Sequence, residues 1–166
     1  MIRQIKRLLI WFLVAFLLCM PTSLSLSSKL LGDPQIDVWN HAWGYWFVFQ
    51  SLMEGVLPFE TKLIGAPGGG ALYYIDTPGA IAGLPFTALF GAAFSYNVIL
   101  LFRFALSALA TQLLTEELSE KGWHSWVAGL GTLSLPFLLC EVTNGISEVC
   151  DIQWGIFALW ATARYL

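Results

Sequence analysis

Residues 78–114 read PGAIAGLPFTALFGAAFSYNVILLFRFALSALATQLL, and this stretch decides the fold. It is apolar almost throughout and holds a single charged residue, Arg103. As one helix its 37 residues would be about 55 Å long, nearly twice the thickness of a membrane's hydrocarbon core. The chain is therefore expected to turn back, and GAAFSYN, residues 91–97, contains turn-tolerant residues. This predicts one span over about 78–92 and another over about 95–115, with the turn at the cytoplasmic face.

The composition of the whole chain also indicates a membrane protein. Of its 166 residues 57% are hydrophobic and only 11% are charged, and the mean hydropathy is +0.70. So few polar side chains cannot cover a soluble core of this size. The net charge is −3, and no basic run is interleaved with aromatic residues. Membrane lipids are thus the expected surroundings, and nucleic acid is not an expected partner.

The N-terminal segment has the pattern of a first membrane span. Three basic residues, Arg3, Lys6 and Arg7, precede an uncharged run over 8–28. Basic residues stay on the cytoplasmic side, so the N-terminus is predicted to be inside and the loop 29–77 outside. A cleavable signal peptide is the alternative interpretation of the same pattern.

Two further apolar segments follow the polar stretch at 115–126. A span is predicted over 126–142 with an interruption at Pro136, and another helix begins at 154. That last segment has 13 residues, too few to cross a membrane. Either 1–166 is the N-terminal fragment of a longer chain, forming a single transmembrane domain, or the last helix lies in the interface.

The first external loop opens with GDPQIDVWNHAWGYW, residues 32–46. Asp33 followed by Pro34 is typical of a helix N-terminus, because Asp accepts from free N–H groups and Pro is tolerated at the first position. Gly55 is a plausible C-terminal end. The pattern predicts an aromatic-rich amphipathic helix over 34–54 that lies along the external membrane surface.

One side of this helix is expected to carry a polar stripe, formed by Asp37, Asn40, His41, Gly44 and Ser51. Asp37 and His41, four residues apart, could form an acid/base or metal-binding pair. Two ligands make a poor metal site, so no cofactor is predicted and a divalent metal stays open. The alternative is that Asp33 caps, Asp37 complements the helix dipole and His41 sits in the interface.

Two cations are candidates for binding a phosphate group. Lys62 is the one basic residue between the surface helix and the second span, and Arg103 lies in the middle of the third span. A charge at that depth must face protein or water. Lys62 could instead be a solvated loop lysine. Gly79 and Gly83 form a GxxxG pattern, which indicates close helix packing.

Short motifs in a fixed order resemble the N-terminal part of bacterial proteins of the GT-C glycosyltransferase superfamily. The resemblance covers roughly residues 8–140 and rests on the order and spacing of the motifs. These are GD at 32–33, Asp37, Trp43, EGVLPF at 54–59, APGG at 66–69, Leu72, Pro78, LP at 84–85, LFG at 89–91, YN at 96–97 and LSALA at 106–110.

The resemblance implies an all-α, multi-span enzyme that moves a sugar from a polyprenyl-phosphate carrier to an extracytoplasmic acceptor. It implies an essential acid in the first external loop, and by position Asp33 is the first candidate and Asp37 the second. The carboxylate would deprotonate the acceptor while Lys62 or Arg103, with His41 nearby, binds the substrate. The bacterial inner membrane is the expected location.

A second interpretation comes from a different class of protein. The chain could be a non-enzymatic membrane subunit or a transporter fragment, in which Gly79, Gly83 and Arg103 make helix contacts. The sequence predicts no particular sugar, acceptor or oligomeric state.

Overall fold

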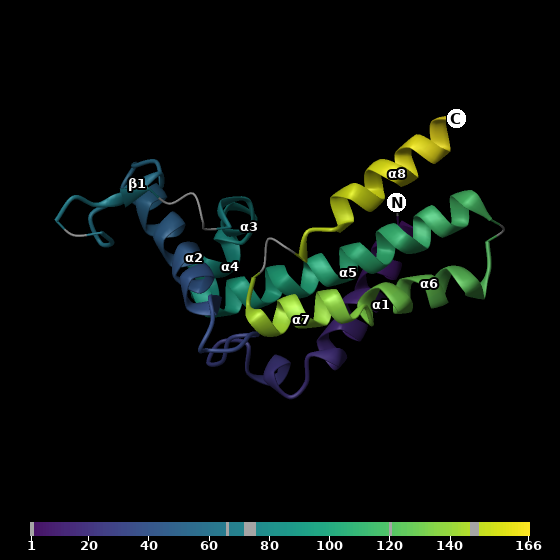
Figure 1. Ribbon diagram of the computed structural model, residues 1–166, viewed down its shortest axis with the longest axis horizontal. Coiled ribbons are helices and arrows are strands. Elements are labelled where there is room, and N and C mark those ends of the chain that lie inside the picture. The colour runs from purple at the N-terminus through teal and green to yellow at the C-terminus, as the bar shows by residue number, and fades with distance from the viewer. Residues whose placement is uncertain (1, 66, 72–75, 120, 147–149) are drawn as a thin grey trace.

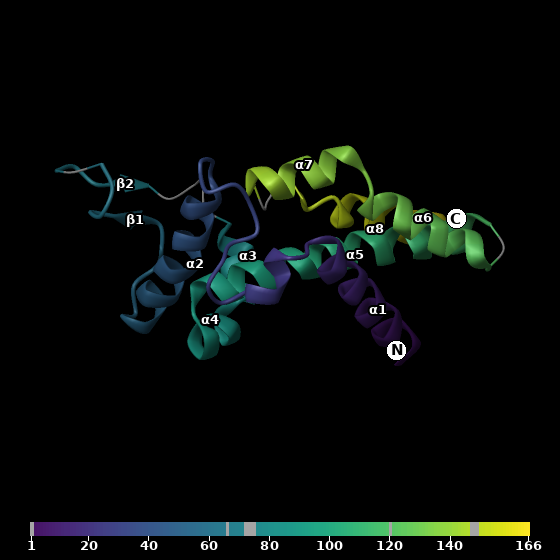
Figure 2. The same cartoon turned by 90° about the horizontal axis from the view of Figure 1, so that it is seen from below.

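The computed structural model describes residues 2–65, 67–71, 76–119, 121–146 and 150–166. Most of these residues are helical, which confirms the all-α prediction apart from one short hairpin (Figures 1 and 2). The elements are α1 (Ile2–Leu18), the 3₁₀ turn η1 (Thr22–Ser25), α2 (Val38–Met53), β1 (Glu60–Thr61), β2 (Gly70–Ala71), α3 (Thr77–Ala82), α4 (Leu84–Phe90), α5 (Ala92–Leu118), α6 (Trp123–Leu133), α7 (Pro136–Asn144) and α8 (Gln153–Tyr165).

Helix α5 is the centre of the molecule. It contacts α1, α6 and α8 along its length and α2, α3 and α4 near its start (Figure 1). Of its 27 residues 15 are buried, and they lie all around the helix. A helix that is apolar on every side needs neighbours on every side, which explains why this segment became the core.

Helix α1 runs antiparallel to α5. Near its start, Arg7 pairs with Glu116 at 2.7 Å, and Trp11 Nε1 donates to Gln112 Oε1 at 2.9 Å. Beyond its end, the N–H of Leu31 donates to the side chain of Asn97 at 2.8 Å. The start of α1 therefore meets the end of α5, and the segment that follows α1 meets the start of α5.

The first predicted span differs in its bounds. The prediction placed it over 8–28, but α1 covers Ile2–Leu18 and includes the basic residues. The helix ends before Pro21, which cannot continue it, and Ser23 donates to the carbonyl of Phe16 at 2.7 Å. Seventeen residues give a helix of about 25 Å.

The predicted span over 78–92 is wrong as a single helix. Gly83 and Pro85 divide it into α3 and α4, with 6 and 7 residues, and neither reaches across a membrane. The turn predicted within 91–97 is found at its first residue, Gly91, which has φ +86° and separates α4 from α5; the helix α5 begins directly after it, at Ala92. The start of α5 contacts Leu31, so it lies beside the loop that was predicted to be external, whereas the prediction placed residues 91–97 at the opposite, cytoplasmic face.

Among the described residues, two helical segments are long and apolar enough to cross a membrane. They are α5 and the stretch Trp123–Asn144, which contains α6 and α7. The predicted interruption at Pro136 is confirmed, since α6 ends at Leu133 and α7 begins at Pro136. Helix α8 has the 13 residues that the sequence indicated.

The stretch between η1 and α5 contains α2, the hairpin, α3 and α4. The predicted helix over 34–54 begins four residues late, at Val38, and ends at Met53 before Gly55 with φ +72°. The β1–β2 hairpin extends beyond α2 at the end of the molecule opposite to α6 (Figure 2).

Candidate functional site

The segment that carries Asp33 is held by one buried side chain of α5. Asn97 is completely buried, and its amide donates to the carbonyls of Leu26 and Lys29, each at 2.7 Å. Its oxygen accepts from the N–H of Leu31 at 2.8 Å. A segment without helix or strand has free backbone groups, and this single amide satisfies three of them.

The neighbouring Tyr96 extends this clamp to the end of α7. Its hydroxyl lies 3.3 Å from the carbonyls of both Leu31 and Gly145. Gly32 has φ +138°, and a Cβ there would lie 3.0 Å from the Cα of Gly145. The backbones approach so closely that only glycine fits. The GD pair at 32–33 and the YN pair at 96–97, two of the short motifs that carry the family resemblance, therefore belong to one contact.

Asp33 itself is half-buried beside this contact. Its N–H donates to the carbonyl of Thr143, and its Oδ1 accepts from the N–H of Gln35 at 2.9 Å. The aspartate thus forms a turn with its own backbone before α2 starts. The interpretation of Asp33 as the helix cap is wrong, because the N-cap position of α2 is Asp37.

The predicted polar stripe of α2 is divided between two environments. Asp37 and Asn40 are exposed, whereas His41 is only 4% exposed and Gly44 and Ser51 are buried. The backbone N–H of His41 donates to the carbonyl of Asp37 at 3.3 Å. The stripe therefore faces protein over most of its length rather than water.

An apolar pocket of about 520 Å³ lies next to Asp33. Gly32 and Pro34, on either side of the aspartate, both line it, and Lys29 is the charged residue of the lining. The rest of the lining comes from the segment after α1, from α2 and from the start of α5: Thr22, Ser27, Ser28, Leu30, Val38, Trp39, Ala42, Trp43, Ala92 and Ala93.

A second polar group surrounds Arg103. This arginine is 6% exposed, as the sequence predicted for a charge within a span. Its Nη2 lies 2.7 Å from Asp76 Oδ1, and its Nε lies 2.9 Å from Asp151 Oδ1. One cation therefore joins the loop before α3 to the segment before α8, and two carboxylates face it.

Tyr45 and Gly79 complete the surroundings of Asp76. The Tyr45 hydroxyl donates to Asp76 Oδ2 at 2.9 Å, and the N–H of Gly79 donates to Oδ1 at 3.0 Å. Burial of the ring, and then the adjacent carboxylate, raise the pKa of Tyr45 well above its ordinary value, so the phenol stays neutral. A Cβ on Gly79 would lie 2.0 Å from Asp76 and 2.5 Å from the Tyr45 hydroxyl.

Asp151 is the most accessible member of this group, which we call the Arg103 cluster: Tyr45, Asp76, Arg103, Asp151 and Gln153. A quarter of the Asp151 side chain is exposed. Gln153 also donates to its Oδ1, at 2.5 Å. Partial burial raises the pKa of Asp151, against the opposing effect of Arg103. With a neutral tyrosine, the cluster carries one positive and two negative charges.

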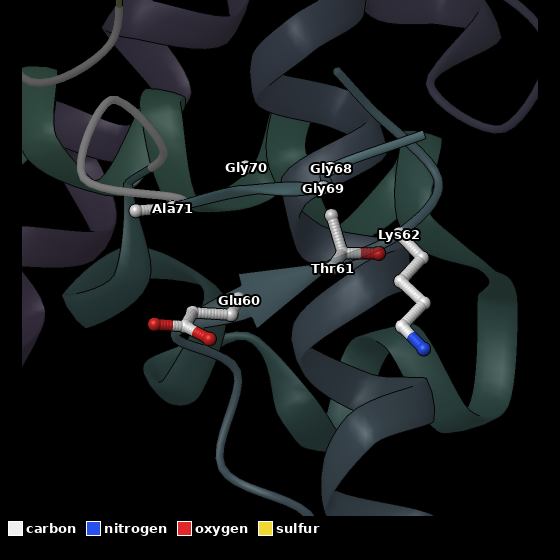
Figure 3. Close-up of a pocket in the computed structure, with 7 residues that line it drawn as sticks. All are labelled: Glu60, Thr61, Lys62, Gly68, Gly69, Gly70 and Ala71. Carbon is white, nitrogen blue, oxygen red and sulfur yellow. The ribbon is translucent and has the colours of Figure 1, made fainter. Parts of the chain in front are cut away.

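The structure does not bring Lys62 to Arg103. Lys62 is exposed on the β1–β2 hairpin, where it lines an open pocket of about 490 Å³ with Glu60 and the backbone of Gly68 to Gly70 (Figure 3). The lining of this pocket includes no residue of the Asp33 segment and none of the residues around Arg103.

Sequence reasoning missed Tyr45, Asp76 and Asp151. Asp76 had a signal, because Asp-Thr-Pro is a helix start and its side chain caps α3 through Gly79. A second signal was Arg103, because a charged residue within an apolar helix needs a partner of opposite charge. Which acid would meet it depends on how the loop folds over α5. Leu72, one of the short motifs that carry the family resemblance, lies outside the described residues.

Within the described ranges, no three His, Cys, Asp or Glu side chains gather in a way that could hold a metal ion. Comparison of the chain with family models, curated proteins and solved structures finds no match.

Proposed function

We propose that this chain is a multi-pass protein of the bacterial inner membrane with its N-terminus in the cytoplasm. The two helical segments that are long and apolar enough to cross a membrane support this. So do Arg3, Lys6 and Arg7, which precede the apolar part of α1. In this topology α5 returns the chain to the cytoplasmic side and α6 with α7 leads it out again. The whole stretch 29–91 then lies outside.

We further propose a GT-C-like function, the transfer of a sugar from a polyprenyl-phosphate donor to an extracytoplasmic acceptor. One observation carries this proposal: an apolar pocket, bordered by Lys29, is lined by Gly32 and Pro34, the two chain neighbours of the half-buried Asp33. A polyprenyl phosphate has an apolar chain and an anionic head. The pocket suits the first part of the chain, and the lysine suits the phosphate.

In this proposal Asp33 is the general base. It removes a proton from the acceptor hydroxyl, whose oxygen attacks the anomeric carbon of the sugar. The bond from that carbon to the phosphate oxygen breaks, and polyprenyl phosphate leaves with the bonding electrons. Lys29 pairs with the negative charge of the leaving phosphate. Asp37, exposed one turn beyond Asp33, is the second candidate for the base.

The clamp formed by Tyr96 and Asn97 supports a catalytic role for the segment 29–33, which it holds in place. A base acts only when it is held close to the proton that it takes. Asn97 holds Lys29 and Leu31 by their backbones, and its amide binds neither the side chain of Lys29 nor that of Asp33. This arrangement is what a preorganised site needs.

Replacing Asp33 by Asn tests the proposal. Asn keeps the size of the side chain and an oxygen for the N–H of Gln35, but it cannot accept the proton. We expect sugar transfer from a polyprenyl-phosphate donor to fall about 10²-fold or more, with unchanged amounts of protein in the membrane. The assay compares the wild-type protein with Asp33→Asn, Asp37→Asn and Lys29→Gln.

The Asp37→Asn variant separates the two carboxylates. If its activity falls and that of Asp33→Asn does not, Asp37 is the base. Full activity in both variants contradicts the catalytic assignment. Absence of transfer by the wild-type protein with every donor favours the second interpretation, a non-enzymatic membrane subunit.

A further inference from the structure

A pocket of about 410 Å³ lies where the first turns of α1 meet the start of α6. Three basic and three apolar residues line it: Ile2, Arg3, Lys6, Arg7, Ile10 and Trp126. The ring of Trp126 packs against that of Trp11, with the ring centroids 5.2 Å apart. Two helices that are packed against each other therefore form this pocket.

The three basic residues of the pocket differ in how their charges are balanced. Arg7 is 6% exposed, and its guanidinium donates to both carboxylate oxygens of Glu116, at 2.7 and 2.9 Å. Arg3 and Lys6 are exposed, and neither forms an ion pair within the described part of the chain. The lining contains no carboxylate among the described residues. Two positive charges are thus left without a paired counter-charge, which indicates an anionic ligand.

Arg3 and Lys6 also begin a stripe that continues along α1 with apolar residues. Ile10, Leu13 and Leu17 follow at spacings of four, three and four residues, so all five side chains share one face of the helix. The three apolar residues are 46%, 56% and 54% exposed. This face therefore has two cations at one end and an uncovered apolar strip beyond them.

The length of this strip matches half of a membrane. From Lys6 to Leu17 the helix rises by about 16 Å, roughly half of a hydrocarbon core of about 30 Å. The pair of Arg7 and Glu116 places the start of α1 beside the end of α5, which is long and apolar enough to cross a membrane. In the proposed topology, the pocket then lies at the level of the cytoplasmic headgroups, where tryptophan is enriched and anionic lipids attract Lys and Arg.

We propose that this pocket binds an anionic phospholipid of the cytoplasmic leaflet. Arg3 and Lys6 pair with its phosphate group, and one acyl chain lies along Ile10, Leu13 and Leu17. A soluble phosphate compound would use the two cations but would leave the apolar strip uncovered. The inference rests on the proposed membrane topology and does not depend on sugar transfer.

The test measures binding of phosphatidylglycerol to the full chain in micelles of an uncharged detergent. Phosphatidylcholine with the same acyl chains is the comparison, because its headgroup has no net charge. We expect the wild type to bind phosphatidylglycerol about tenfold tighter or more. One basic residue contributes about a fivefold factor, so Arg3→Gln and Lys6→Gln should each weaken phosphatidylglycerol about fivefold and leave phosphatidylcholine unchanged.

Lys121→Gln is the matched control. It removes the same charge from an exposed lysine between α5 and α6, at the same end of the molecule but outside the pocket lining, and should change neither affinity. Arg3→Gln and Lys6→Gln, made singly, each keep two basic residues before the apolar part of α1, so the orientation of the chain should be retained. Glycerophosphoglycerol, the same headgroup without acyl chains, should displace the lipid only at far higher concentrations.

Three results would overturn the inference and leave the proposed topology standing. Equal affinities for the two phospholipids would show that the pocket does not select an anionic headgroup. An equal loss in Lys121→Gln and Lys6→Gln would show that the overall charge of this end attracts the lipid. Displacement by glycerophosphoglycerol at the concentration of the lipid itself would make the ligand a soluble phosphate ester. If the chain is instead found outside the membrane fraction of cells, the proposed topology fails together with the site.

Discussion

The side-chain oxygen of Asn97 accepts a hydrogen bond from the N–H of Leu31 at 2.8 Å, across 66 positions of sequence. Asn97 is in the second turn of α5, and Leu31 precedes the GD pair. This contact places the start of α5 beside the segment that follows α1. Together with the pair of Arg7 and Glu116 at the other end, it sets α1 and α5 antiparallel.

The first prediction concerns membrane topology. In a cysteine-free variant, single cysteines at Leu63 and at Phe90, both exposed, should react with an impermeant thiol reagent in sealed cells. A cysteine at Lys121, between α5 and α6, should react only after the membrane is opened. Protection at position 90 together with reaction at 121 would contradict this topology.

The second prediction concerns the clamp. Asn97→Leu keeps the volume of the side chain but leaves the N–H of Leu31 and two carbonyls without their partner. We expect a loss of about 1–3 kcal/mol in the free energy of unfolding for each buried group left unpaired. Thermal or denaturant unfolding in detergent measures it. Asn40→Leu is the control on an exposed position and should stay within about 0.5 kcal/mol of the wild type.

The third prediction compares two glycines. Gly79→Ala would bring a methyl group to 2.0 Å from Asp76 and 2.7 Å from Arg103, so the Arg103 cluster must open. We expect a loss of about 1–3 kcal/mol in stability. Gly131→Ala, on an exposed face of α6 with nothing within 4 Å, should be neutral or stabilising by up to about 1 kcal/mol. Equal effects at both positions would rule out the packing role of Gly79.

The fourth prediction concerns pH. The folded pKa of Tyr45 is raised above the ordinary value of 10.0, so its contribution to stability is complete below pH 10 and is lost as the pH rises toward the folded pKa. In an absorbance titration of tyrosinate, the wild type minus Tyr45→Phe should show no phenol ionising near pH 10. A normal titration step in that difference would show that the ring is accessible to water.

Several elements could be predicted from local sequence alone. The central apolar segment, the interruption at Pro136 and the end of α2 before Gly55 depend on hydropathy and on the backbone preferences of proline and glycine. These act within a few residues, so they can be read along the chain. The errors at 8–28 and 78–92 arose where hydropathy was counted over a longer run than the breaks at Pro21, Gly83 and Pro85 allow.

The sequence by itself determined that the chain is helical, that α5 has to be surrounded on all sides and that Arg103 needs a partner. Only the tertiary structure decided which partners meet. Asp76 and Asp151 lie 27 and 48 positions from Arg103, on opposite sides of it in the sequence. Asn97 meets backbone groups that carry no sequence pattern at all. Such contacts depend on how whole segments fold over α5, because hydrogen bonds and ion pairs act between atoms that are close in space, whatever their distance along the chain.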